Sequence, residues 1–140
     1  AGTGIGAANG SVDLNVPTVT LVTTATGGIN LNNLAAATFT KSRHSALVGT
    51  GLDVWLTSNG IQRLIISGIR TEQCCETTAR VGSDLGYAVD FVSEATLTFP
   101  MTHQGTGQVF SAQDITTRTE LVLANRFARI VTVDTCLSSL

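Results

Sequence analysis

The sequence predicts an α/β protein with a three-layer, Rossmann-like fold, in which helices cover both faces of a parallel sheet. Short runs of β-branched and apolar residues recur along the chain, and helix-like segments separate them. These runs show little polar alternation, which is typical of strands buried on both faces. Their alternation with helices predicts βαβ crossovers. Ligands of such sheets bind at the carboxyl ends of the strands.

Five segments are expected to form strands because each is short, apolar and rich in β-branched residues. They are residues 18–23, 37–41, 64–68, 87–92 and 129–133.

Two helices are expected where a hydroxyl residue is followed three positions later by an acid, a pattern similar to a capping box. The pattern occurs at residues 50–53 and 111–114. The helices that it opens should run to about Asn59 and Phe127.

A third helix should begin near Cys74 and end at Leu85, with Gly86 as its C-terminal cap. From residue 75 onward, helical spacing places mostly small side chains on one face, which suits close packing against the sheet. These residues are Cys75, Thr78, Ala79, Gly82 and Leu85.

Composition limits the protein's setting. A chain of 140 residues is the size of one domain, so we treat 1–140 as a single domain. Charged residues make up 13% and hydrophobic residues 43%, too little polar surface for a lone globule, so we expect a homo-oligomer. The eight Lys and Arg residues form no cluster, and the net charge is −2, so neither nucleic acid nor an anionic membrane is an expected partner.

The sequence also predicts a cytoplasmic location. The sequence has no apolar run near the roughly 20 residues of a membrane span and no signal-peptide pattern. Three cysteines do not make a disulfide framework, so free thiols in a reducing compartment are expected. Gly2, Gly4 and Gly6 lack the spacing of a dinucleotide-binding loop, and no cofactor is expected.

The adjacent cysteines of the stretch GIRTEQCCETTAR raise the main functional question. If a strand ends at Gly68 and a helix begins near Cys74, the thiol of Cys74 lies in the first helical turn, close to free backbone N–H groups that favour a thiolate. Cys75 then belongs to the core, while Cys74 faces the crevice. The alternative is that Cys74 is an ordinary buried cysteine that serves only packing.

Two stretches resemble the isochorismatase-like cysteine hydrolase superfamily, which includes nicotinamidases and N-carbamoylsarcosine amidohydrolase. The first is the pattern G-x-x-T-x-x-C-x-x-x-T-A at residues 68–79, preceded by RLIIS and followed by GYAVDFVSEA. The second is KSRHSALVGTGLDVWLTSNGIQRLIISG, which is similar to the family's lysine segment. The resemblance covers roughly residues 16–133.

The resemblance implies a catalytic set. The family's cysteine nucleophile corresponds to Cys74, and its lysine corresponds to Lys41. The family's cis peptide would fall at Ile69-Arg70, so that the backbone N–H groups of Arg70 and Cys74 point at an oxyanion. His44 and Thr71 are further candidates for the pocket.

The family's third catalytic residue, an aspartate that acts as general base, has no counterpart here. Asp13 is the only carboxylate before Lys41, and it lies four residues before Pro17, whereas a parallel crossover needs a dozen residues or more. We therefore expect the chain to lack a segment of roughly 60 residues, the size of an α/β unit. Leu47 and Glu94 stand where the family often has Phe and Asp, which leaves pocket details open.

The remaining polar residues give weaker signals. His44 and His103 could each act as a base or help to bind metal, but a loop histidine is the simpler interpretation of His103. Nicotinamidase-like members carry an Asp-x-His metal set, and the corresponding residues 23–33 contain no Asp or His, so no metal is expected. Arg70 could meet an acidic substrate group or could be a solvent-facing loop arginine.

The resemblance thus implies a cysteine-nucleophile hydrolase that cleaves a C–N bond of a small amide through a thioester. An isochorismatase-type vinyl-ether hydrolase is an alternative, although that branch does not need the cysteine that is kept here. The other alternative is a non-catalytic binding or assembly protein on the same fold.

The absent aspartate generates a first prediction. Intact mass spectrometry of the native protein should give a mass several kilodaltons above the 14.5 kDa of this sequence, because a thiol nucleophile needs a base within hydrogen-bond reach. The additional segment should place an Asp at the end of an apolar strand. A mass of 14.5 kDa from an active protein would instead direct attention to His44 or Asp13 as the base.

Overall fold

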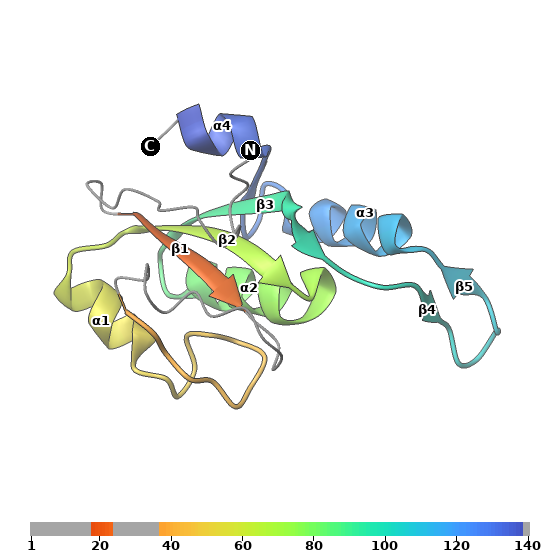
Figure 1. Ribbon diagram of the computed structural model, residues 1–140, viewed down its shortest axis with the longest axis horizontal. Helices are drawn as coiled ribbons and strands as arrows, with labels where there is room; N and C mark the ends of the chain where they lie inside the picture. The colour runs from red at the N-terminus through yellow and green to blue at the C-terminus, as the bar shows by residue number, and fades with distance from the viewer. Residues whose placement is uncertain (1–17, 24–36, 139–140) are drawn as a thin grey trace.

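The computed structural model describes the backbone of residues 18–23 and all of residues 37–138. Its main feature is a four-stranded parallel sheet in the order β1-β2-β3-β6 (Figure 1). The strands are β1 (Thr18–Thr23), β2 (Arg63–Ile69), β3 (Ala88–Leu97) and β6 (Arg129–Val131). The predicted α/β fold with a parallel sheet is confirmed.

Helices cover both faces of this sheet. α1 (Leu52–Ser58), α2 (Glu76–Asp84) and α3 (Ala112–Leu123) contribute to the larger core on one face. α4 (Val133–Ser138) packs on the other face through Cys136. Figure 1 shows α4 on the opposite side of the sheet from α2. In the described ranges, no helix is long and apolar enough to cross a membrane.

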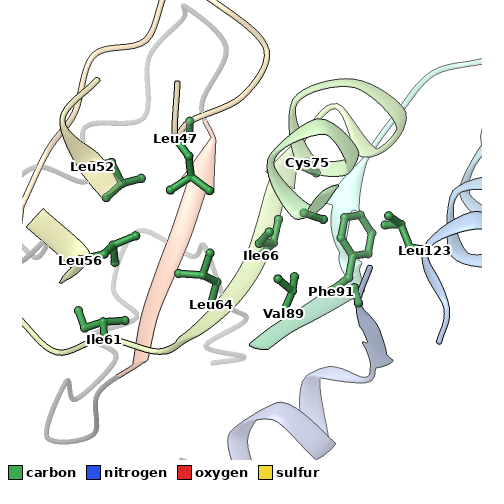
Figure 2. Close-up of a cluster of buried hydrophobic side chains, with 13 residues drawn as sticks. Leu47, Leu52, Leu56, Ile61, Leu64, Ile66, Cys75, Val89, Phe91 and Leu123 are labelled. Carbon is green, nitrogen blue, oxygen red and sulfur yellow. The ribbon is translucent and has the colours of Figure 1, made fainter. Parts of the chain in front are cut away.

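The larger core forms because side chains of β2 and β3 alternate between the two faces. Leu64 and Ile66 of β2 point to the face of α1 and α2, whereas Ile65 joins the cluster beneath α4. All three are fully buried. Figure 2 shows the larger cluster, to which α1, β2, β3 and α3 contribute side chains together with Cys75 near the start of α2.

The ladder between β2 and β3 determines where the chain turns. It pairs Arg63 with Ala88, shifts register between Ile66 and Gly68, and ends with Ile69 opposite Leu97. On its other side β2 pairs with β1 up to Gly68. A π-helical turn, η1 (Thr71–Cys75), follows directly and leads into α2.

The small face predicted for α2 is confirmed for four of its five residues. Cys75, Thr78, Ala79 and Gly82 are buried, and a Cβ on Gly82 would come within 2.9 Å of Leu64 Cδ1. The fifth residue was placed wrongly. Leu85 is 55% exposed, because it is the C-cap of α2 and the chain leaves the helix there, with Gly86 at a φ of 91°.

One of the two predicted capping boxes is present. The Ser111 hydroxyl accepts from Asp114 N, and Ser111 N donates back to the Asp114 carboxylate. α3 ends four residues before the expected Phe127, because Ala124 is extended and Asn125 has a φ of 60°.

The box expected at residues 50–53 is wrong. Gly51, with a φ of 78°, is the N-cap of α1 and makes no side-chain cap. The hydroxyl of Thr50 instead donates to the carbonyl of Ala46. The predicted end of α1 is confirmed, with Asn59 as its C-cap.

Four strand predictions locate real strands, and one is wrong. Residues 37–41 are not a strand, and they take no place in the described sheet, whose order is β1-β2-β3-β6. The fourth expected strand continues to Leu97, and the fifth stops at Val131, where α4 soon begins. The short antiparallel hairpin of β4 (Met101–Thr102) and β5 (Val109–Phe110), which projects from the body in Figure 1, was not expected.

A buried carboxylate joins three strands on the α4 face. Asp90 of β3 is 3% exposed and accepts hydrogen bonds from Arg63 of β2 and Arg129 of β6. Burial raises the pKa of Asp90, but the hydrogen bonds and positive charges of the two arginines outweigh it and hold this pKa below its usual value. The ionised carboxylate therefore stabilises the folded state.

This cluster predicts a pH-dependent loss of stability. Asp90→Asn should lower the free energy of unfolding by roughly 1–3 kcal/mol at neutral pH, because the charged hydrogen bonds from the two arginines lose their anion. The contribution is present above the unfolded pKa of about 4 and is lost as the pH falls through the lowered folded pKa. Urea unfolding at neutral and acidic pH should therefore show that the difference in free energy of unfolding between variant and wild type becomes smaller in acid. Exposed Asp84→Asn is the control, and a gap independent of pH would contradict the assignment.

Candidate active site

The candidate nucleophile lies on the turn that follows β2. The Ile69-Arg70 peptide is cis, and η1 begins at Thr71. The carbonyl of Arg70 accepts from the N–H groups of Gln73 and Cys75, at 3.2 and 3.1 Å. The two adjacent thiols face different surroundings, since Cys75 is fully buried in the larger core and Cys74 is partly exposed.

Lys41 reaches the thiol of Cys74 from a segment 33 residues earlier in the chain. Its Nζ donates to Cys74 Sγ at 3.3 Å and to the carbonyl of Arg43 at 3.0 Å. Both Lys41 and Cys74 are partly buried.

Packing against α1 and α2 holds the lysine segment in place although it is not a strand. Ala46 N donates to the buried hydroxyl of Thr78 on α2 at 3.0 Å. Leu47 is buried in the larger core, and Phe39 packs edge-to-face on Trp55 of α1 at 6.0 Å between ring centroids. The helix that follows Cys74 therefore also positions the loop that carries Lys41.

A lysine ammonium at hydrogen-bond distance is a neighbour typical of reactive cysteines in proteins. The other two cysteines are buried. Cys75 is 0% and Cys136 1% exposed. Burial, assisted by the negative charge of Asp90, raises the pKa of the Cys136 thiol and keeps it protonated.

The other site candidates lie as follows. His44 is exposed, three residues after Lys41. Thr71 is fully buried, and its hydroxyl donates to Thr96, so it lies in the packing beneath the turn. Arg70 is half-buried, with its guanidinium 5.0 Å from the centroid of the Phe99 ring. His103 is exposed between β4 and β5 and hydrogen-bonds with Thr106.

The remaining sequence candidates either have other roles or cannot be placed. The carboxylate of Glu94 accepts from Val133 N at 2.8 Å, at the start of α4. Asp13 and residues 24–33 lie outside the described residues. Among the residues that are described, no group of three or more His, Cys, Asp or Glu side chains could hold a metal ion.

Sequence reasoning missed two acidic residues near the site. Glu76 is 5% exposed and accepts from Arg80, Arg118 and Thr119, which fastens α2 to α3. The spacing of Glu76 and Arg80 on one helix was the available signal. Glu72, two residues before Cys74, is also nearly buried, and nothing in the sequence pattern distinguished it from a surface acid.

Comparison with known proteins agrees with this geometry. The family model described as the isochorismatase domain matches residues 23–120. The chain belongs to the isochorismatase family. This membership confirms the resemblance that the cysteine and lysine motifs indicated.

Relatives and solved structures of this family are similar to the chain. It is 34% identical to the uncharacterized isochorismatase family protein YrdC of Bacillus subtilis over 95 residues, 68% of this chain and 50% of that protein. It is 41% identical to Nicotinamidase 3 of Arabidopsis thaliana over 59 residues, 42% of this chain and 30% of that protein. A cysteine hydrolase from Pseudomonas syringae superimposes with a TM-score of 0.67 at 28% identity, covering 70% of this chain and 46% of the other.

A structure of an isochorismatase from Pseudomonas putida is also similar, with a TM-score of 0.65 at 26% identity over 69% of this chain and 49% of the other. The chain therefore spans half or less of the length of these relatives.

The environments of the three thiols predict selective alkylation. Iodoacetamide below pH 8 should label Cys74 at least about tenfold faster than the two buried cysteines, because Cys74 is partly exposed and lies beside the Lys41 ammonium group. Peptide mass spectrometry measures the rates. Lys41→Met removes the charge but keeps a side chain of similar length, and it should slow the alkylation of Cys74 alone. Equal labelling of all three thiols would contradict the assignment.

Proposed function

We propose that the protein is a cysteine hydrolase that cleaves the C–N bond of a small amide through a thioester on Cys74. The contact that carries the proposal is the 3.3 Å hydrogen bond from Lys41 Nζ to Cys74 Sγ, on the turn after a central parallel strand. The carboxyl end of a parallel sheet is where ligands of such folds bind. Family membership and the likeness to a cysteine hydrolase support the same chemistry.

The proposed reaction has two steps. The Cys74 thiolate attacks the carbonyl carbon, and the bond from carbon to nitrogen breaks as the amine leaves with a proton. Water then attacks the thioester, which releases the acid and returns the thiol. Lys41 stabilises the thiolate, and we assign the oxyanion to the backbone N–H groups of Arg70 and Cys74. The described residues place no carboxylate against the Cys74 thiol, so we leave the proton acceptor of the first step unassigned.

Substitution of the two adjacent cysteines separates catalysis from packing. Cys74→Ala should lower kcat for hydrolysis of small amides by at least about a thousandfold, as loss of a covalent nucleophile does. Cys75→Ala is the matched control, because it leaves a cavity in the larger core and should cost about 1–2 kcal/mol of stability while kcat stays nearly unchanged. Ammonia release from a panel of primary amides that includes nicotinamide measures turnover, and thermal unfolding measures stability.

The outcomes also separate the alternatives. A covalent adduct on Cys74, seen as added intact mass during turnover and absent from Cys74→Ser, is expected for the thioester route. Full amide hydrolysis by Cys74→Ala would overturn the proposal. Turnover of a vinyl ether but of no amide would identify the isochorismatase-type reaction, and a wild-type protein without turnover or selective labelling would be a binding protein.

A further inference from the structure

Side chains of another segment of the chain hold the turn that carries Cys74. Beyond the last pairs of the ladder between β2 and β3, residues of the turn contact the end of β3 and the residues after it. We call this set the turn clamp, and its members are Arg70, Thr71 and Glu72 on the turn, and Thr96, Thr98 and Phe99 on the other side.

Each of the three turn residues has its own partner in the clamp. Thr71 Oγ1 donates to Thr96 Oγ1 at 2.9 Å. The carboxylate of Glu72 accepts from Thr98 Oγ1 at 2.6 Å. The guanidinium of Arg70 lies over the Phe99 ring. Three consecutive residues are therefore fastened to a segment that is remote in sequence.

Glu72 is the least expected member of the clamp. Its side chain is only 9% exposed, and Oε1 has no hydrogen-bond partner within the described part of the chain. The nearest cation is Arg70, with 3.9 Å between Nε and Oε1. Burial of an incompletely paired carboxylate costs free energy, so the packing of the larger core does not by itself explain an acid at this position.

We propose that Glu72 is a positioning residue that holds the nucleophile turn through Thr98 and Arg70, an inference that rests on the proposed function of Cys74. Backbone hydrogen bonds hold the turn internally: the Arg70 carbonyl accepts from Gln73 and Cys75, and the Thr71 carbonyl accepts from Glu76. The clamp adds the side-chain contacts that fix this turn against the end of β3. Because the distance from Cys74 Sγ to Lys41 Nζ depends on where this turn lies, loosening the clamp displaces the thiol from its ammonium partner. A displacement of about 1 Å is enough to slow a reaction strongly.

The chain offers a matched pair of variants for the test. Thr98→Val removes a hydroxyl that donates to Glu72, and Thr119→Val removes a hydroxyl that donates to the buried carboxylate of Glu76. Both replace one threonine donor to a buried acid by an isosteric methyl group. Only the first touches the turn clamp, because Glu76 fastens the body of α2 to α3.

Three measurements on the full chain carry the test: amide hydrogen exchange of residues 70–75, the alkylation rate of Cys74 and steady-state kinetics. Thr98→Val should raise the amide exchange rate of the turn about tenfold and lower kcat about tenfold, as expected for loss of a hydrogen bond to a charged group. KM should change little. Thr119→Val should lower the melting temperature to a similar extent without these changes. Glu72→Gln keeps an acceptor for Thr98, so its exchange rate in the turn and its kcat should lie between those of the wild type and Glu72→Ala.

The inference is overturned if exchange in the turn is unchanged in both Thr98→Val and Glu72→Ala, or if Thr119→Val alters the turn and Cys74 equally. Failure of the proposed function would look different. It would appear in the wild type as absent turnover and unselective labelling, and hydrogen exchange would still decide whether the clamp holds the turn.

Discussion

Burial of β2 on both faces is the constraint on which the rest of the structure depends. Leu64, Ile65 and Ile66 are each fully buried and alternate between the two hydrophobic clusters, so one strand joins the layers on either side of the sheet. Its ladders to β1 and β3 determine where the strand ends, at Ile69. The chain must leave the sheet there, and Cys74 lies on the turn that follows.

α2 connects this frame to the chemistry. Its small residues allow the helix to lie close to the sheet, with Gly82 against Leu64. The same helix binds the lysine segment, through the hydrogen bond from Ala46 to Thr78. Cys74, the proposed nucleophile, and Lys41 are therefore positioned by one element, although they are 33 residues apart in the chain. This arrangement explains how a segment without secondary structure can present Lys41 accurately.

Buried carboxylates connect the elements of a chain that has only ten acidic residues. Asp90 joins β2, β3 and β6, and Glu76 joins α2 to α3. Glu72 joins the nucleophile turn to the end of β3. Each lies where elements distant in sequence meet, and each is paired with arginine, because a buried anion is tolerated only with charged partners and hydrogen bonds.

The sequence by itself determined the fold class, four of the strands and the burial of Cys75, because uninterrupted apolar runs and a stripe of small residues have few other solutions. The Ser111 cap also followed from local chemistry, since its partner Asp114 is three residues away. The family motifs identified Cys74 and Lys41 as candidates. Only the tertiary structure brought their side chains within 3.3 Å of each other.

What sequence reasoning missed depends on partners that are remote in the chain. The Thr50 hydroxyl donates to the carbonyl of Ala46 and accepts from Leu52 N, and Gly51 is the N-cap of α1. α4 begins at Val133, whose N–H donates to Glu94 of β3, a contact that no local pattern announces. Residues 37–41 are not a strand and pair with none of the four strands of the described sheet. Glu72 looked like a surface acid until folding placed Thr98 and Arg70 around it.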